Sequence, residues 1–253
     1  MRTASYLIAV VLGLALSLGA GSAQAETTNC TPITGVPTII TVQGIYCFTG
    51  DLATGMTSGV AIQIQTNNVV LDLNGFKLGD LAAGPGTHAV GIFAANLQNI
   101  TSKNGTIRGF AAAIFLEDTG ASQAHVVEDI RADQNRQGGI DVEGDGIIVR
   151  NNQVVATGGS TAFGANVNAI GIFVSGTGPR VLNNDVINTV AQGTGTAWGI
   201  LLSSVTGGLV VNNRITGADT GIQFNFSTGK YRDTLTFDVT TPFIGGTAVG
   251  TNN

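Results

Sequence analysis

The sequence predicts an all-β protein built as a solenoid of about seven stacked coils. A small residue followed by isoleucine opens a short apolar strand at Ala61-Ile62, Gly91-Ile92, Ala113-Ile114, Gly139-Ile140, Gly171-Ile172, Gly199-Ile200 and Gly221-Ile222. These isoleucines lie 22 to 32 residues apart, which is the length range of one coil in a solenoid. Only 11% of the residues are charged, and the chain has 37 glycines. This composition suits many short strands joined by tight turns.

The order of segments within each coil predicts three short strands per coil. Residues 69–73 are apolar and lead through Asn74-Gly75 into a further short strand at 76–78. An asparagine occupies this corner in five coils, at Asn74-Gly75, Asn104-Gly105, Asn151-Asn152, Asn183-Asn184 and Asn212-Asn213. Asparagine tolerates the left-handed conformation, and stacked amides can bond one another, so we expect an asparagine ladder. Glu128-Asp129-Ile130 replaces the pair in one coil, whose corner must be built differently.

Gly-Ile strands, asparagine corners and a variable third turn together resemble the right-handed parallel β-helix of the pectate-lyase-like superfamily, over about residues 58–226. The resemblance implies a single-stranded right-handed parallel β-helix. It implies no particular reaction, because this fold carries lyases, hydrolases, epimerases, phage adhesins and proteins without known activity. The Asp-Asp and Gly-His-Gly motifs of polygalacturonase-like hydrolases are absent, as are Arg-x-Pro-x-x-Arg of pectate lyases and Asp-Pro-His of alginate epimerases.

The two ends of the chain depart from the repeat. Residues 1–25 have the features of a secretory signal peptide, with Arg2, an apolar run at 7–18 and a cleavage site at Ala23-Gln24-Ala25. The run is shorter than the roughly 20 residues that span a bilayer, so we expect a secreted protein, extracellular or periplasmic, without a membrane span. Residues 26–57 and 227–253 are expected to form an N-terminal cap and a C-terminal capping tail. This tail resembles the C-terminal segments of secreted bacterial members of the superfamily whose function is not assigned.

Cysteine and charge content narrow the chemistry. Cys30 and Cys47 are the two cysteines, and in an oxidising compartment they would form a disulfide worth about 3 kcal/mol. A metal or redox pair is the alternative, but the spacing is not Cys-x-x-Cys, and His88 and His125 are distant in sequence. The net charge of −5, without clusters of lysine and arginine, argues against a nucleic acid partner.

Strand alternation predicts which side chains of the opening strands face outward, because the isoleucine faces the core. The first outward column is Gln63, Phe93, Phe115, Asp141, Phe173, Leu201 and Gln223. The second column is Gln65, Ala95, Glu117, Glu143, Ser175, Ser203 and Asn225. Carboxylates and aromatic rings therefore meet in the central coils.

These columns contain the candidate site residues. Glu117, Asp141 and Glu143 would lie about 4.8 Å apart between strands and about 6.7 Å apart along a strand, measured at the backbone. Carboxyl groups at such separations are candidates for glycosidase catalysis, and Phe93, Phe115 and Phe173 could stack on sugar rings. No cofactor is required, although Glu117, Asp141, Glu143 and Asp145 could instead hold calcium. A lyase also needs a basic residue, and Arg131, Arg136 and Arg180 lie outside both columns.

Long insertions precede three opening strands, at residues 79–90, 156–169 and 189–197. Insertions at one corner of successive coils would form a wall beside the opening-strand face, although tolerated variation in loop length is an alternative. We expect a protein that binds an extracellular polysaccharide or a cell-surface partner along this face. A polysaccharide lyase or glycoside hydrolase is the first alternative.

The second alternative is a structural or assembly protein that oligomerises through the phenylalanine stripe, with the outward acids serving solubility. His88 and His125 are expected to be structural, and Trp198 to pack against the adjacent loop.

Overall fold

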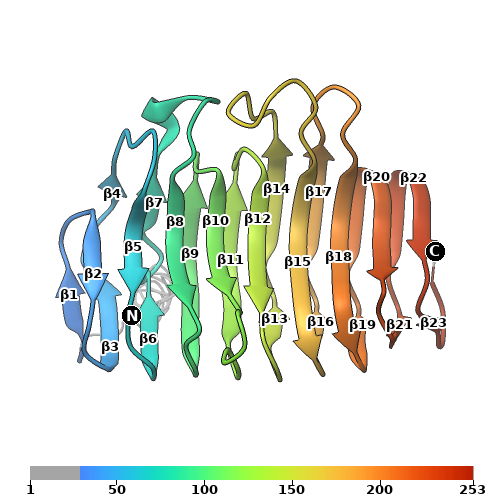
Figure 1. The fold of residues 1–253 in the computed structure, drawn as a ribbon, viewed down its shortest axis with the longest axis horizontal. Coiled ribbons are helices and arrows are strands. Elements are labelled where there is room, and N and C mark those ends of the chain that lie inside the picture. The colour runs from blue at the N-terminus through green and yellow to red at the C-terminus, as the bar shows by residue number, and fades with distance from the viewer. Residues whose placement is uncertain (1–28, 253) are drawn as a thin grey trace, which may run out of the picture.

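The computed structural model describes residues 29–252, and the expected signal peptide at 1–25 lies outside this range. The fold is a right-handed parallel β-helix of about eight turns, slightly more than expected (Figure 1). Its strands form three parallel β-sheets that run along the length of the molecule. A single 3-10 turn, η1 (Leu81–Ala83), is the one helical element among these residues.

The opening strands form the first sheet. It contains β2 (Thr38–Ile40), β5 (Val60–Ile64), β8 (Val90–Ala95), β10 (Ala112–Glu117), β12 (Gly138–Glu143), β15 (Ala169–Thr177), β18 (Ala197–Thr206) and the second halves of β20 (Arg214–Asn225) and β22 (Leu235–Ile244). Each strand pairs in parallel with the equivalent strand of the next coil, as the sequence predicts.

The other two sheets complete each turn. The second contains β1 (Thr31–Ile33), β3 (Gly44–Phe48), β6 (Val69–Asp72), the first halves of β9 (Ile100–Arg108) and β11 (Val126–Asp133), β13 (Ile148–Arg150), β16 (Arg180–Leu182), β19 (Gly208–Val211), β21 (Gly229–Arg232) and β23 (Thr247–Ala248). The third contains β4 (Leu52–Ala53), β7 (Lys77–Gly79), β14 (Gln153–Gly158), β17 (Asp185–Val190) and the remaining halves of the long strands.

Parallel pairing extends beyond the predicted repeat boundaries of 58–226. At one end β2 pairs with β5, and at the other β21 pairs with β19 and β22 with β20. The opening strands of these turns carry Thr38 and Phe243 at the isoleucine position, so the sequence repeat alone did not reveal them. The segments predicted as caps therefore contribute strands to the same sheets, while their capping role stays a prediction.

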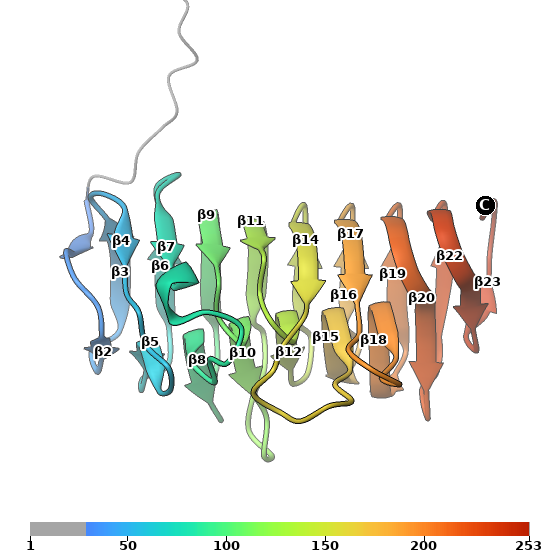
Figure 2. The same cartoon turned by 90° about the horizontal axis from the view of Figure 1, so that it is seen from above.

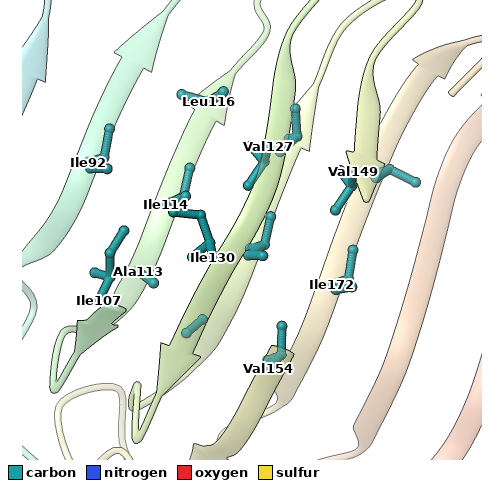
Figure 3. Close-up of a cluster of buried hydrophobic side chains, with 14 of the residues drawn as sticks. Ile92, Ile107, Ala113, Ile114, Leu116, Val127, Ile130, Val149, Val154 and Ile172 are labelled. Carbon is teal, nitrogen blue, oxygen red and sulfur yellow. The ribbon is translucent and has the colours of Figure 1, made fainter. Parts of the chain in front are cut away.

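The opening isoleucines form the core and explain the repeat. All seven are buried, and Figure 3 shows Ile92, Ile114 and Ile172 following one another along the interior. The preceding residue must be small because the next coil approaches closely. A Cβ at Gly139 would lie 2.4 Å from the carbonyl oxygen of Gly171, and one at Gly171 would lie 2.6 Å from the carbonyl oxygen of Gly199. Close coil stacking thus favours the small residue before each isoleucine.

The asparagine corner forms the expected ladder. Asn152 Nδ2 donates to Asn184 Oδ1, and Asn184 Nδ2 donates to Asn213 Oδ1, both at 3.0 Å between buried side chains. The first asparagine of each pair takes the left-handed conformation, with φ of 56° at Asn183. In the coil that lacks the pair, Ile130 N donates to Asn152 Oδ1 at 2.9 Å. The neighbouring asparagine therefore completes that corner.

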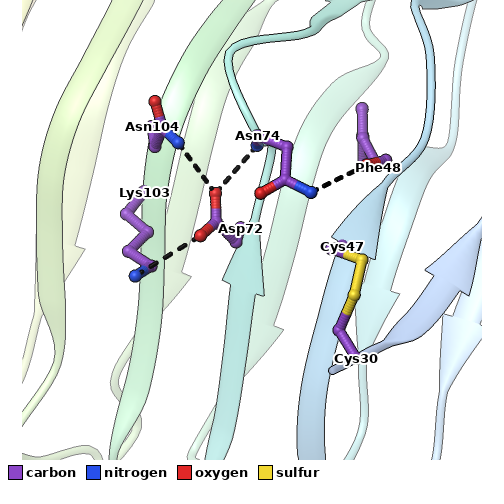
Figure 4. The surroundings of a disulfide bond; sticks show 7 residues. All are labelled: Cys30, Cys47, Phe48, Asp72, Asn74, Lys103 and Asn104. Carbon is purple, nitrogen blue, oxygen red and sulfur yellow. Dashed lines mark hydrogen bonds and ion pairs between the residues drawn. A yellow bond between two sulfur atoms is a disulfide. The ribbon is translucent and has the colours of Figure 1, made fainter. Parts of the chain in front are cut away.

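A disulfide joins β3 to the residue just before β1. Cys30 and Cys47 are bonded, with their Cα atoms 5.8 Å apart (Figure 4). Cys47 is buried. The predicted disulfide between the two cysteines is confirmed, and the alternative prediction of a metal-binding or redox-active cysteine pair is wrong.

Candidate functional site

The first outward column lies on the opening-strand sheet in the register that alternation predicts. Phe93 pairs with Phe115, Phe115 with Asp141, and Asp141 with Phe173, each on adjacent strands. The rings of Phe93 and Phe115 meet edge to face, with centroids 5.6 Å apart. All four side chains are half-buried, so this stretch of the column is accessible to a ligand.

The second column brings two glutamates beside Asp141. Glu117 and Glu143 directly follow the paired residues Leu116 and Val142, and Glu143 pairs with Ser175 of the next strand. Glu143 Oε2 also accepts a hydrogen bond from Asp118 N at 3.2 Å. The column then continues, because Ser175 and Ser203 directly follow the paired residues Val174 and Leu202, and Ser203 pairs with Asn225. The three predicted carboxylates therefore share one face, and the second column runs on through Ser175, Ser203 and Asn225 as expected.

The three insertions join one another along one edge of this face. Thr161 N donates to Pro85 O at 2.9 Å, which ties the β14–β15 insertion to the β7–β8 insertion. Val167 and Gln192 exchange two backbone hydrogen bonds of 3.0 and 2.9 Å, which tie in the β17–β18 insertion. Figure 1 shows the loops along the upper edge of the β-helix, and Figure 2 shows the β14–β15 loop reaching toward β12. The insertions therefore form the expected wall.

Beneath this wall lies a cavity of about 360 Å³. Phe115, Asp141 and Phe173 of the first column line it. His88 and Phe163 line it from the insertions, and their rings meet edge to face with centroids 4.6 Å apart. Asp141 is the one lining residue with a carboxylate, and no lysine or arginine lines the cavity. The cavity therefore combines aromatic walls with a single acid.

Asp141 is the unusual polar group of this cavity. Its Oδ1 atom is buried and has no hydrogen-bond partner among the described residues. Burial raises the pKa of Asp141 well above 3.8, and the negative charges of Glu143 and Glu117 raise it further. These effects favour the protonated carboxyl, which can donate a hydrogen bond to a ligand oxygen as well as accept one.

The neighbouring acids have different environments. Burial raises the pKa of Glu143, against the opposing effect of the hydrogen bond from Asp118 N. The pKa of Asp118 is lowered by hydrogen bonds from the N–H groups of Ser122, Gly120 and Ala121. Asp118 thus organises its own loop, whereas Asp141 is held in an environment that favours a bound proton.

The residues predicted as calcium ligands do not form a metal centre. Asp145 is exposed, and its Oδ1 accepts a hydrogen bond from Thr177 N at 2.7 Å in the next turn. Within residues 29–252, no group of three or more His, Cys, Asp or Glu side chains could hold a metal ion.

The two histidines and Trp198, which the sequence predicted to be structural, lie in different environments. His125 is buried, and its Nδ1 accepts a hydrogen bond from Ile100 N at 3.2 Å. His88 lies at the cavity, although the sequence predicted a structural role for it. Trp198 Nε1 donates to Gln223 Oε1 at 2.5 Å across the opening-strand face. Phe163 was missed, although it is the one aromatic residue of its insertion, and that isolation was a usable signal.

Comparisons with known proteins find similar solved structures, but no family model and no curated relative. Among solved structures, the chain is similar to the catalytic domain of a GH87 alpha-1,3-glucanase in complex with nigerose, with 10% identity, 88% of this chain covered and a TM-score of 0.32. A second structure of that domain, in complex with tetrasaccharides, has 12% identity, 83% coverage and a TM-score of 0.30. The matched part spans 64% of the length of each glucanase chain.

Residues 29–252 contain no helix that is both long and apolar enough to cross a bilayer.

Proposed function

We propose that the opening-strand face binds an extracellular polysaccharide, with the cavity at Asp141 as the centre of the site. The observation that carries this proposal is the buried, unpartnered Oδ1 of Asp141 in a cavity lined by Phe115 and Phe173. Buried polar atoms in folded proteins nearly always have partners, so an orphan atom in an open cavity suits a ligand hydroxyl.

The aromatic residues suit the same ligand. A sugar ring has apolar C–H faces and a rim of hydroxyl groups, so it binds between aromatic surfaces and a few polar groups. Phe115 and Phe173 flank Asp141 on adjacent strands, which places ring surfaces on both sides of the acid. Phe93 extends the aromatic surface by one coil beyond the cavity.

Calorimetry or affinity electrophoresis with a panel of neutral and acidic polysaccharides tests this proposal. We expect Phe115→Ala to weaken binding at least tenfold, which corresponds to about 1.4 kcal/mol. Phe237→Ala is the matched control, because Phe237 is 76% exposed on β22 and lies outside the site. Equal binding by both variants, or no binding to any polysaccharide by the wild type, would contradict the proposal.

Hydrolysis of the bound glycan is the second candidate function, and the raised pKa of Asp141 favours it. A carboxyl group that keeps its proton can act as general acid, while Glu143 or Glu117 acts as nucleophile or base. A lyase is less well supported because no lysine or arginine lines the cavity.

Release of reducing sugar by the wild type, and its loss in both Asp141→Asn and Glu143→Gln, is the expected result for a hydrolase. Binding that is retained in both variants without product at any stage would leave a binding protein. Product that persists in Asp141→Asn would exclude Asp141 as the acid.

A further inference from the structure

We infer that the cavity at Asp141 receives the terminal residue of an uncharged glycan chain, while the following sugar residues lie over Phe93. This inference rests on the proposed function and adds the ligand class and the binding mode. It depends on three features of the face, namely a closed side, a roof and a cavity lining without lysine or arginine.

The closed side lies beyond Phe173. Leu201 is the next residue of the outward column, and it pairs directly with Phe173. Unlike Phe93, Phe115 and Phe173, it is buried, with 8% of its surface exposed. Trp198 lies near the beginning of the same strand, and its Nε1 donates a hydrogen bond to Gln223 Oε1. Gln223 pairs with Leu201 on the next strand. The indole therefore extends across the face beside Leu201, where a continuing glycan chain would have to lie.

The roof comes from two insertions held together. The contact between Thr161 N and Pro85 O and the ring contact between His88 and Phe163 join the loops above the cavity. The third insertion is fixed to the second through Val167 and Gln192. Toward β8 the column stays accessible, because Phe93 is half-buried and does not line the cavity. A chain can therefore leave the cavity over Phe93 but not over Leu201.

The volume fits a chain end better than a long segment. The cavity holds about 360 Å³, which is near the lower limit of the roughly 300–1,000 Å³ typical of small-molecule sites. One or two sugar residues would fill it. A polymer segment that crossed the whole face would need a groove open at both sides.

Charge selects against acidic sugars. Asp141 lines the cavity, and Glu143 and Glu117 lie beside it, without a lysine or arginine in the lining. A uronate carboxylate placed here would meet carboxyl groups in a partly buried environment and find no cation to pair with, which is unfavourable. The hydroxyl groups of a neutral sugar can both donate to and accept from Asp141.

Binding stoichiometry on linear polymers tests the terminal mode. Sedimentation measures the number of protein molecules bound per chain, for linear neutral glucans, mannans and xylans of increasing length and for polyuronates as comparison. We expect about one protein per chain at every length, and at least tenfold weaker binding of the polyuronates. A stoichiometry that rises with chain length would overturn terminal binding and leave the proposed function intact. A preference for polyuronates would overturn the charge argument, and no binding to any polymer would contradict the proposed function itself.

Variants of the closed side and of the roof test the terminal binding mode further, on the neutral polymer that the wild type binds. Trp198→Ala opens the closed side, so the stoichiometry should begin to rise with chain length. Gln223→Ala removes the partner of the indole and serves as the second variant if Trp198→Ala does not fold. Phe163→Ala should weaken binding of short oligosaccharides about tenfold, whereas Phe226→Ala, at a residue 90% exposed in the turn after β20, should leave it unchanged. Unchanged stoichiometry in both opened variants, or equal effects of Phe163→Ala and Phe226→Ala, would overturn the inference.

Discussion

The asparagine corner and the opening-strand face both contain buried polar groups, but these groups have opposite hydrogen-bonding states. At the corner, Asn184 Nδ2 donates to Asn213 Oδ1 and Val149 O, while its Oδ1 accepts from Asn152. On the face, Asp141 Oδ1 has no partner among the described residues. Complete hydrogen bonding at the corner stabilises the fold, and its absence on the face leaves a group free to bind a ligand.

An aspartate at the corner makes the contrast sharper. Asp72 is buried like the asparagines, but it accepts hydrogen bonds from Asn74 N at 2.8 Å and Asn104 Nδ2 at 3.1 Å and lies 3.4 Å from Lys103 Nζ (Figure 4). Burial of an aspartate is therefore not by itself a sign of function in this chain. The unpartnered Oδ1 atom distinguishes Asp141 from Asp72.

Breaking the ladder should have the largest effect on stability. Asn184→Ala removes the side-chain hydrogen bonds to Asn152 N, Val149 O and Asn213 Oδ1 in the core, so we expect a loss on the order of 4 kcal/mol in the free energy of unfolding. Asn183→Gly is the control, because it keeps the left-handed conformation at an exposed corner position and should cost less than about 1 kcal/mol. Urea denaturation measures both, and similar losses in the two variants would contradict the assignment of the ladder as structural.

His125 provides a pH-dependent test of a satisfied buried group. Burial lowers its pKa to about 4 from 6.5, against a partial opposing effect of Asp118. Between pH 6.5 and pH 4 the imidazole of His125 is therefore protonated in the unfolded chain and neutral in the folded chain. The free energy of unfolding consequently falls as the pH falls through that range. We expect a loss of about 3 kcal/mol from pH 7 to pH 4, at 1.36 kcal/mol per pH unit.

His125→Gln should remove most of this pH dependence. Urea denaturation at half-unit pH steps measures it in both proteins. An unchanged slope in His125→Gln would show that another group dominates acid sensitivity.

Asp141 should give a pH dependence of the opposite sign. Its pKa is raised in the folded state, so stability is fully present below the unfolded pKa near 3.8 and is lost as the pH rises through the folded pKa. Asp141→Asn removes this loss. The variant should therefore become progressively more stable than the wild type as the pH rises above 4, while its ligand binding is weakened. A variant that is less stable than the wild type at neutral pH would mean that Asp141 has a structural partner.

The opening-strand side of the site, with Phe115 and Asp141, could be predicted from the sequence because two periodicities determine it. Alternation along each strand turns Phe115 and Asp141 outward, and the Gly-Ile repeat stacks them on adjacent strands. Both consequences follow from local geometry. The second column follows for the same reason, since Glu143 pairs with Ser175 and Ser203 with Asn225.

The roof could not be predicted in the same way. Contacts such as Thr161 N to Pro85 O join glycine-rich loops about 76 residues apart (161 minus 85) and depend on the paths of both loops. No periodicity encodes those paths. The unpartnered state of Asp141 was equally invisible, because alternation gives direction but not hydrogen bonding. The turns outside 58–226 were missed because their opening strands, β2 and β22, pair in parallel without a Gly-Ile step.

The smallest stability effect is expected on the face itself. Phe93 is half-buried and its described ring contact is the edge-to-face one with Phe115, so Phe93→Ala should lower the free energy of unfolding by about 1 kcal/mol or less. A buried core phenylalanine such as Phe48 would cost about 3–5 kcal/mol on the same substitution. Thermal and urea denaturation of Phe93→Ala and Phe48→Ala measure the difference directly. A loss near the core value at Phe93 would mean that the aromatic stripe is retained for packing, and the face would then resemble the asparagine corner rather than contrast with it.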